Sequence, residues 1–180
     1  MAENHGYWTA AETEDPAEEI TLAGGSAASS SPAVTTEGST VTITAGGTYS
    51  VSGNLTGQLI IDADEEQVIL ILDGAEITNP DSAAILISAA EGVQLVLADG
   101  TENSVSDADS YAGDAAVDAA IFADADLEIT GSGALTVSGN GADGIASKKD
   151  LVLTGGQITV PAAEHGLRGK DALLVTSGEI

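Results

Sequence analysis

A degenerate repeat of about 22 to 25 residues constrains the fold of this chain more than any other feature of its sequence. Its clearest copies begin at Ile121, Ile145 and Leu167, and looser copies begin near Ile60 and Ile85. Each copy contains short segments in which apolar and polar residues alternate, separated by glycine turns. Alternation with a period of two is typical of strands with one buried face. A repeat of this length, built from such strands, is typical of a solenoid whose coils stack.

The spacing of the copies favours a parallel arrangement of strands. Equivalent positions recur without the hairpin alternation of an antiparallel sheet, which argues against sandwiches and barrels. The longest interval, from Ile85 to Ile121, contains an aspartate-bearing loop at residues 106–118, and removing it returns a normal coil length. We therefore predict an all-β fold, a right-handed parallel β-helix of about five to six coils with about three short strands in each. No segment has the pattern of an amphipathic helix.

The chain divides into a leader and a repeat domain. Residues 1–19 are polar and acidic without a usable period or the pattern of a signal peptide, and we expect a disordered leader or linker. Residues 20–180 form the predicted solenoid domain, with a short strand at 19–22 and an irregular stretch at 23–36. The last copy stops at Ile180, and an uncapped coil exposes strand edges, so we expect further coils beyond it.

The charge of the chain limits its partners. The 180 residues include 29 acidic and four basic side chains, a formal net charge of −25. Nucleic acids and anionic membrane surfaces are bound through many Lys and Arg side chains, so both are poor partners. No apolar run approaches the length of a transmembrane helix. The acidity serves solubility, or some carboxylates bind Ca²⁺, which takes oxygen ligands. The chain has no cysteine, which excludes thiolate metal sites.

The basic residues gather on adjacent copies of the repeat. Alignment of the copies places Asp124, Lys148 and Lys170 in one column, and Asp126 and Asp150 in another. Stacked strands lie about 4.8 Å apart, so we expect these side chains to share one edge of the solenoid. The predicted metal ligands are Asp124, Asp126, Asp143, Asp150, Glu164 and Asp171. The predicted carbohydrate contacts are Lys148, Arg168, Lys170 and Asp143.

Three interpretations of this edge stay open. Two carboxylates at that spacing repel each other by roughly 1 kcal/mol in water, so lysines or a bound cation must neutralise them. The edge is a solvated ladder of mixed charges, a Ca²⁺ site, or a site for an anionic sugar, and Ca²⁺ and sugar can bind together. We predict no catalytic residue, because carboxylate pairs arise by chance among so many acids. Aromatic residues are scarce, which argues against a flat aromatic row for crystalline polysaccharide: Tyr7, Trp8, Tyr49, Tyr111 and Phe122 are the whole supply.

A run of motifs resembles a known family. The sequence Asn-Gly-Ala-Asp-Gly-Ile occupies 140–145, Thr-Gly-Gly occupies 154–156, and Gly-Leu-Arg-Gly-Lys-Asp occupies 166–171. From about residue 20 onward the chain resembles bacterial carbohydrate-binding domain-containing proteins with a pectate-lyase-like β-helix. The resemblance implies a secreted or surface-attached protein with Ca²⁺ sites that binds sugar without established catalysis. The chain departs from the family pattern at 123–126, 148–150 and 164–165, where each change removes or moves an oxygen ligand.

We therefore expect a non-catalytic extracellular protein that binds a polysaccharide with help from Ca²⁺. The expected ligand is an acidic, pectin-like polysaccharide, or cellulose. One alternative is a Ca²⁺-dependent polysaccharide lyase that uses Arg168 or Lys170 as its base. The other is an adhesin or surface-fibre segment whose coils associate end to end.

Overall fold

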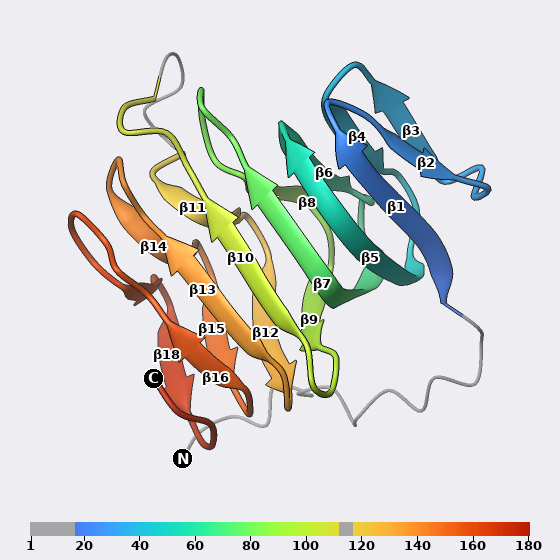
Figure 1. The fold of residues 1–180 in the computed structure, drawn as a ribbon. Helices are drawn as coiled ribbons and strands as arrows, with labels where there is room; N and C mark the ends of the chain where they lie inside the picture. Colours follow the sequence, from blue (N-terminus) through green and yellow to red (C-terminus); the bar gives the residue numbers. More distant parts are fainter. Residues whose placement is uncertain (1–16, 112–116) are drawn as a thin grey trace.

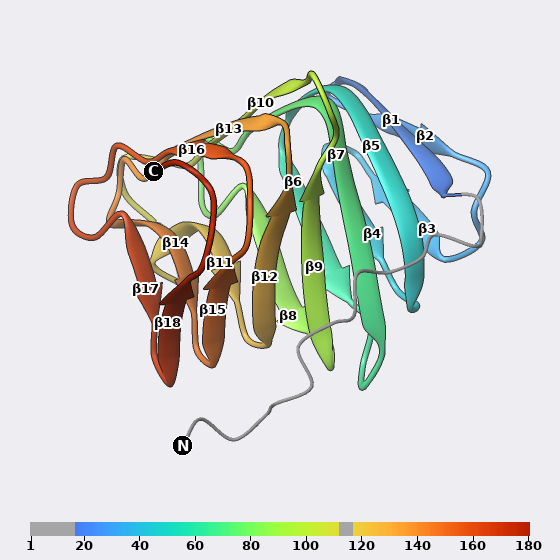
Figure 2. The ribbon, with the colours of Figure 1, turned by 90° about the horizontal axis from the view of Figure 1, so that it is seen from below.

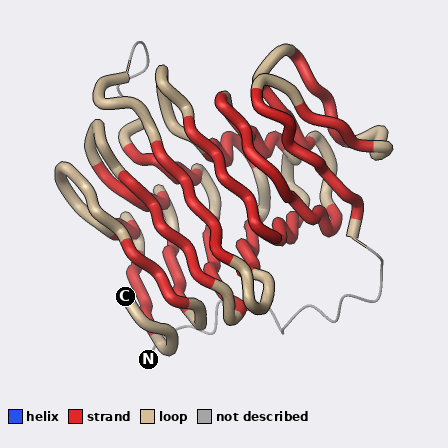
Figure 3. The backbone as a smooth tube through the Cα atoms, viewed as in Figure 1, coloured by secondary structure: helices blue, strands red, loops and turns tan. Residues whose placement is uncertain are grey.

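The computed structural model describes residues 17–111 and 117–180. Within these ranges the secondary structure consists of strands and short turns without a helix (Figure 3). The described residues therefore include no helix that is long and apolar enough to cross a membrane. The fold of this part of the chain is all-β, as the alternating sequence pattern predicts.

One sheet contains seven strands, and most of its neighbours pair in parallel. Its order is β17-β14-β11-β8-β6-β4-β3, and Figure 1 shows it running from the red end of the molecule to the blue end. The bounds are β3 (Val34–Glu37), β4 (Thr40–Ile43), β6 (Gln58–Asp62), β8 (Ile85–Ala89), β11 (Ala119–Ala123), β14 (Asp143–Ser147) and β17 (Leu167–Gly169).

The other sheet contains eleven strands and forms two rows that join at β7 (Figure 2). Strands β9, β12, β15 and β18 follow one part of β7, and β10, β13 and β16 follow the other. The bounds are β1 (Glu18–Gly24), β2 (Ala27–Ser29), β5 (Gly47–Thr56), β7 (Gln67–Thr78), β9 (Gly92–Leu97), β10 (Glu102–Ser106), β12 (Asp126–Gly131), β13 (Ala134–Ser138), β15 (Asp150–Leu153), β16 (Gln157–Thr159) and β18 (Ala172–Val175).

Strand β7 continues through an Asp-Gly pair, a dipeptide that predicts a turn. The Asp-Gly pair at 73–74 lies inside this twelve-residue strand. Gly74 has a φ of 73°, a conformation that glycine adopts without steric cost. The chain therefore bends at this corner without leaving the sheet, and the predicted turn is a bend within a strand.

Successive copies of the repeat pair in parallel and nearly in the predicted register. Ile85 pairs with Ile121, Ile121 with Ile145, and Ile145 with Leu167. The predicted first copy is displaced by one residue, because Leu59, and not Ile60, pairs with Ile85. A shift of one residue turns a side chain to the opposite face of a strand. Leu59 is accordingly buried, whereas Ile60 is partly exposed.

The first strands of the described chain include antiparallel pairs. Strand β1 pairs with β2, and β3 pairs with β4. The prediction that residues 23–36 are irregular is therefore wrong, since β2 and β3 lie there. Small Ala and Ser side chains have weak strand propensity, and pairing with β1 and β4 supplies the hydrogen bonds that hold them extended. Strand β1 begins at Glu18, inside the predicted leader, whose first sixteen residues lie outside the described ranges.

Most of the core is one large cluster of stacked, mainly aliphatic side chains, and a small second cluster surrounds Phe122. In one column of the larger sheet, equivalent positions of four neighbouring strands are buried and paired: Val68, Val93, Leu127 and Leu151. Fully burying one such side chain contributes about 1.5–3 kcal/mol. The stack therefore holds the turns between strands in a fixed register, and the candidate functional residues lie on these turns.

Candidate functional site

The structure divides the predicted site residues into two groups at opposite ends of strand β14, with Glu164 beside the first group. Asp143 is the first residue of β14, and Lys148 follows its last residue. Five residues of extended chain span about 16 Å, so one ligand atom cannot touch both side chains. We call Asp118, Asp143, His165 and Arg168 the arginine cluster. We call Asp124, Asp126, Lys148, Lys149, Asp150, Lys170 and Asp171 the lysine edge.

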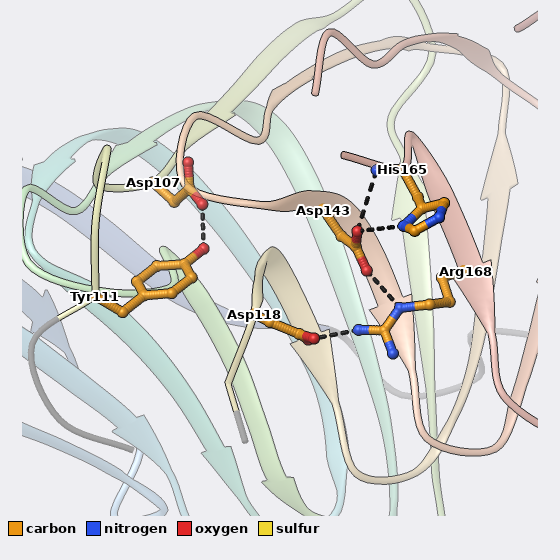
Figure 4. Close-up of polar contacts among 6 residues, drawn as sticks. All are labelled: Asp107, Tyr111, Asp118, Asp143, His165 and Arg168. Atoms are coloured by element: carbon orange, nitrogen blue, oxygen red, sulfur yellow. Dashed lines mark hydrogen bonds and ion pairs between the residues drawn. The ribbon is translucent and has the colours of Figure 1, made fainter. Parts of the chain in front are cut away.

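Asp143 is the centre of the arginine cluster. Its side chain is only 2% exposed. The backbone N–H of His165 donates to its Oδ1 at 3.1 Å, and Nδ1 of the same residue lies 2.9 Å from that oxygen. Arg168 Nε donates to the other carboxylate oxygen, and Arg168 Nη2 donates to Asp118 (Figure 4). The guanidinium therefore bridges two carboxylates.

Backbone pairing between three neighbouring turns brings these residues together. The N–H of Asp143 donates to the carbonyl of Asp118 at 3.0 Å, and the N–H of Gly144 donates to the carbonyl of His165 at 2.8 Å. Gly144 has no room for a side chain, because an added Cβ would lie against Val160 and 2.8 Å from the carbonyl oxygen of Gly166. The Asp-Gly pair therefore lets the next turn approach closely enough to cover the carboxylate.

The hydrogen bonds of this cluster decide its protonation. Burial by itself would raise the pKa of Asp143, but hydrogen bonds from His165 and Arg168 outweigh it and hold that pKa below its usual value. Burial disfavours the charged guanidinium of Arg168, but its contacts with Asp143 and Asp118 raise its pKa. At neutral pH the cluster is an ionised carboxylate held by a permanently charged arginine.

A second buried carboxylate, Asp107, anchors the start of the loop at 106–118. Its Oδ1 accepts the backbone N–H of Asn140 at 2.6 Å, and its Oδ2 accepts the hydroxyl of Tyr111. The side chain of Asn140 donates back to the carbonyl of Asp107 at 2.9 Å. Asp107 belongs to the aspartate-bearing loop of the sequence, but its structural role was not predicted. The one signal for its burial was its position directly after an alternating strand. Asp114 of the same loop lies outside the described residues.

The lysine edge has the column arrangement that the repeat predicts. The N–H of Lys148 donates to the carbonyl of Ala123 at 2.9 Å, and the N–H of Lys170 donates to the carbonyl of Ser147 at 3.0 Å. Lys148 Nζ lies 3.3 Å from Asp124 Oδ2 and 5.5 Å from the centre of the Phe122 ring. Asp126 Oδ1 accepts the backbone N–H of Asp150 at 3.2 Å, so these two aspartates are neighbours.

A shallow groove of about 670 Å³ adjoins the lysine edge. It lies at the turns that follow β6, β8 and β11, and carboxylates dominate its polar lining. Its charged and hydroxyl-bearing lining residues are Asp64, Glu65, Ser88, Glu91, Asp124 and Lys149. Of these, only Asp124 was predicted as a site residue. The sequence signal for the other groove residues was the recurrence of acidic residues at the turns of earlier copies. That recurrence was missed because the repeat is weaker in that part of the chain.

The two groups differ in how well they suit a metal ion. Ligand atoms of Asp143, Glu164 and His165 lie within 4.8 Å of one another. Both carboxylate oxygens of Asp143 already accept hydrogen bonds, and the charge of Arg168 opposes a cation there. Asp126 and Asp150 are half-buried, stand on adjacent turns and offer the oxygen ligands that Ca²⁺ prefers. The lysine edge therefore suits a hard cation better than the arginine cluster does.

Comparisons with known proteins agree with the architecture. A family model described as a carbohydrate-binding domain-containing protein matches residues 37–180. A curated protein of Acetivibrio thermocellus with the same description is 43% identical over 128 residues, which are 68% of this chain and 45% of the relative. The chain thus spans about half the length of this curated relative.

A solved structure resembles most of the chain. It is described as the structure of the polysaccharide lyase-like protein from C. thermocellum, gadolinium derivative. It superposes with a TM-score of 0.88 at 35% sequence identity and covers 91% of this chain and 68% of the other. This similarity supports the pectate-lyase-like fold that the sequence motifs predict.

Proposed function

The chain belongs to the family of carbohydrate-binding domain-containing proteins, and we propose that it binds an acidic polysaccharide outside the cell with the help of Ca²⁺ and without catalysis. The family match and the polysaccharide lyase-like neighbour support a carbohydrate-binding role and a polysaccharide partner. The extracellular location follows from the ligand, because a cell-wall polymer does not enter the cytoplasm. The observation that carries the proposal is the family match over 37–180, which includes every residue of the lysine edge.

We propose in addition that the fold is a right-handed parallel β-helix of five to six coils. The parallel pairing of successive copies in both sheets supports this assignment. Right-handed connections between parallel strands are the rule in proteins. In this arrangement the turns form continuous edges along the solenoid, and a linear polymer can lie along such an edge.

The lysine edge is the proposed contact for the acidic sugars. Lys148, Lys149 and Lys170 are exposed on two successive turns. In the described part of the chain, the side chains of Lys149 and Lys170 form no ion pair, so their ammonium groups are available to a ligand. Charged hydrogen bonds to carboxylates are about twice as strong as neutral ones. A uronate unit is therefore a better ligand for this edge than a neutral sugar.

Ca²⁺ is proposed to bind at the same edge. Asp124, Asp126, Asp150 and Asp171 would supply oxygen ligands, and the ion would bridge them to the carboxylates of the polymer. Asp143 is left out of this proposal because Arg168 already neutralises its charge. Glu164 is left out because the ligand atoms near it belong to Asp143 and His165 in the arginine cluster.

A polysaccharide pull-down tests this proposal. The wild-type chain is mixed with insoluble pectin, alginate or cellulose, with and without a chelator, and the bound fraction is measured. We expect retention on pectin or alginate that falls several-fold with chelator or with Lys148→Ala/Lys170→Ala. The matched variant Lys148→Arg/Lys170→Arg keeps the charges and should keep most of the binding. Equal retention by the alanine and arginine variants would refute the lysine edge as the contact.

A lyase remains the second candidate because the structural neighbour is described as polysaccharide lyase-like. The base of such an enzyme must lose a proton, and Arg168 is unsuited because its two carboxylate partners raise its pKa. Lys170 is exposed and is the remaining candidate base. Incubation with polygalacturonate and Ca²⁺, followed by ultraviolet absorbance of unsaturated uronides, separates the two functions. If the wild type forms product and Lys170→Ala does not, the protein is a lyase and the proposal of binding without catalysis is refuted.

A further inference from the structure

We propose that Tyr111 and the arginine cluster form a separate binding subsite for one neutral pyranose unit, with the Tyr111 ring against the C–H face of the sugar. This inference rests on the proposed carbohydrate-binding function, but it concerns the opposite end of β14 from the lysine edge. It names a stacking residue and a sugar class for a part of the surface that the acidic-polymer proposal does not use.

Among the aromatic residues that the structure describes, Tyr111 is the one that is not buried. Tyr49 is 2% exposed and Phe122 is 4% exposed, so both belong to the interior. Tyr111 is partly exposed. The weakly positive C–H groups of a pyranose are attracted to the negative face of an aromatic ring. Any stacking contact that the described surface makes with a sugar must therefore use Tyr111.

The ring of Tyr111 is held in one orientation before a ligand binds. Its hydroxyl donates to the buried carboxylate of Asp107, which the backbone of Asn140 holds in turn. Below the ring, Gly141 leaves the necessary space, because an added Cβ would lie 3.5 Å from Tyr111 Cζ and 2.7 Å from the carbonyl oxygen of Ala108. A side chain that is already ordered loses little conformational entropy on binding, which favours its use as a platform.

The arginine cluster lies beside this ring. Asn140 donates its backbone N–H to Asp107, the partner of the Tyr111 hydroxyl, and is three residues from Asp143 in the chain. Burial and the hydrogen bond to Asp107 raise the pKa of Tyr111, and the charges of Asp118 and Asp143 raise it further. Figure 4 draws Tyr111, Asp118 and Arg168 in one close-up, and in this view Asp118 lies between the ring and the guanidinium. The ring and the charged groups can therefore contact one sugar unit together.

The cluster offers the donors and acceptors that sugar hydroxyls require. Arg168 uses Nε and Nη2 on its carboxylate partners, and Nη1 has no hydrogen-bond partner in the described residues. Asp118 is partly exposed and has one carboxylate oxygen bound to Arg168. A guanidinium donor and a carboxylate acceptor held next to each other suit two neighbouring hydroxyl groups of a pyranose.

The charge of the cluster selects a neutral sugar. Asp118 and Asp143 share a single guanidinium, and Asp107 adds a carboxylate at the Tyr111 hydroxyl, so the local charge is negative. The negative charge would repel a uronate carboxylate placed there, whereas a neutral sugar unit carries no charge to be repelled. The lysine edge has the opposite preference because its ammonium groups are not all paired. The two ends of β14 therefore discriminate between neutral and acidic sugars.

Isothermal titration of the wild-type chain with cellohexaose and with an oligogalacturonate of equal length tests the inference. We expect Tyr111→Ala to weaken cellohexaose binding about tenfold, the upper range for one aromatic contact, and to leave oligogalacturonate binding unchanged. Tyr111→Phe keeps the ring and loses only the bond to Asp107, so it should bind within about threefold of the wild type. Tyr111→Leu keeps the apolar bulk without a flat ring and should resemble the alanine variant.

The outcomes separate this inference from the proposed function. If the wild type binds oligogalacturonate, but cellohexaose affinity is absent or is equal in the wild type and Tyr111→Leu, the subsite is refuted and the acidic-polymer proposal stands. If the wild type binds neither sugar, both fail. If thermal melting shows that the variants do not fold, nuclear magnetic resonance of the wild-type aromatic rings tests the subsite instead. Cellohexaose must shift the Tyr111 ring signals, and their invariance at saturating sugar refutes the contact.

Discussion

At the scale of single residues, the buried carboxylate of Asp143 shows how a charge is kept inside an acidic protein. Its two oxygens receive hydrogen bonds from the backbone of His165 and from Arg168. Removing a charged group from water is costly unless it is paired and hydrogen-bonded. The low pKa of Asp143 means that these bonds stabilise its ionised form more than burial destabilises it.

Replacing Asp143 by Asn tests this balance through its pH dependence. Because the folded-state pKa lies below the unfolded value of about 3.9, the carboxylate contributes stability that is fully present above that value and is lost as pH falls through the folded pKa. We expect Asp143→Asn to lower the free energy of unfolding by about 1–3 kcal/mol at pH 7. The difference from wild type should shrink below pH 4 in urea denaturation.

An exposed aspartate on another strand provides the control for this prediction. Asp73 lies in the bend of β7, away from the arginine cluster, and Asp73→Asn should behave as the wild type at every pH. A difference between Asp143→Asn and the wild type that stays constant from pH 7 to pH 2 would contradict the ionic account. That result would indicate a loss of packing only.

At the scale of strands and turns, glycine sets how closely successive copies stack. Gly155 lies over Gly131, and Gly178 lies over Gly155, at the turn between the second and third strands of each copy. A Cβ added to Gly155 would lie 2.5 Å from the carbonyl oxygen of Gly131, and one added to Gly178 would lie 2.9 Å from that of Gly155. Strands spaced about 4.8 Å apart leave no room for a side chain pointing along the stack. The glycine turns of the repeat are therefore a packing requirement.

Gly155→Ala should destabilise the protein through this steric contact. Neither Gly155 nor Gly25 has a positive φ, and a Cβ at Gly25 would meet no atom within 4 Å. We expect Gly155→Ala to lower the free energy of unfolding by about 1–3 kcal/mol, as overpacking does. Gly25→Ala should be neutral or slightly stabilising, because alanine restricts the unfolded chain. Thermal melting of both variants measures the difference, and equal melting temperatures would contradict the steric argument.

At the scale of the whole molecule, the net charge of −25 opposes the compact state. Only four basic residues offset it: Lys148 and Lys149 follow β14, Arg168 lies in the neighbouring strand β17, and Lys170 follows β17. Within the described residues, the ion pairs gather in the same region. A bound cation at the lysine edge would relieve the repulsion where two half-buried aspartates stand on adjacent turns.

Calcium should therefore raise the melting temperature of the protein beyond the effect of salt alone. At a concentration one hundred times its Kd, a ligand specific to the folded state stabilises it by about 2.7 kcal/mol. We expect the Ca²⁺-dependent rise to fall by half or more in Asp126→Asn/Asp150→Asn, whereas NaCl at equal ionic strength gives only the small general rise of screening. Differential scanning calorimetry of each sample measures these shifts.

The control carries two equivalent changes far from the lysine edge. Asp73→Asn/Glu102→Gln removes the same formal charge from exposed positions on β7 and β10. If its Ca²⁺-dependent shift falls as much as that of Asp126→Asn/Asp150→Asn, Ca²⁺ acts only on the general charge. The proposed metal site is then excluded.

The sequence by itself determined the local and repetitive part of this structure. Alternating residues identify strands such as β4 and the first part of β5, since a pleated strand with one buried face requires that pattern. The spacing of the copies places Lys148 beside Asp124 and Asp126 beside Asp150, because positions equivalent in a repeat become neighbours when the copies stack. The family follows from motifs that are contiguous in the chain.

Only the tertiary structure decided the remaining features, because they depend on contacts between distant turns and on the direction of side chains. Pairing across the sheet places Leu59, and not Ile60, opposite Ile85. It also keeps β7 continuous through the bend at Gly74. The length of β14 separated Asp143 from Lys148, although five residues look close in a sequence. The repeat thus predicts which residues stack, whereas the folded chain decides which end of each strand they occupy and what they touch.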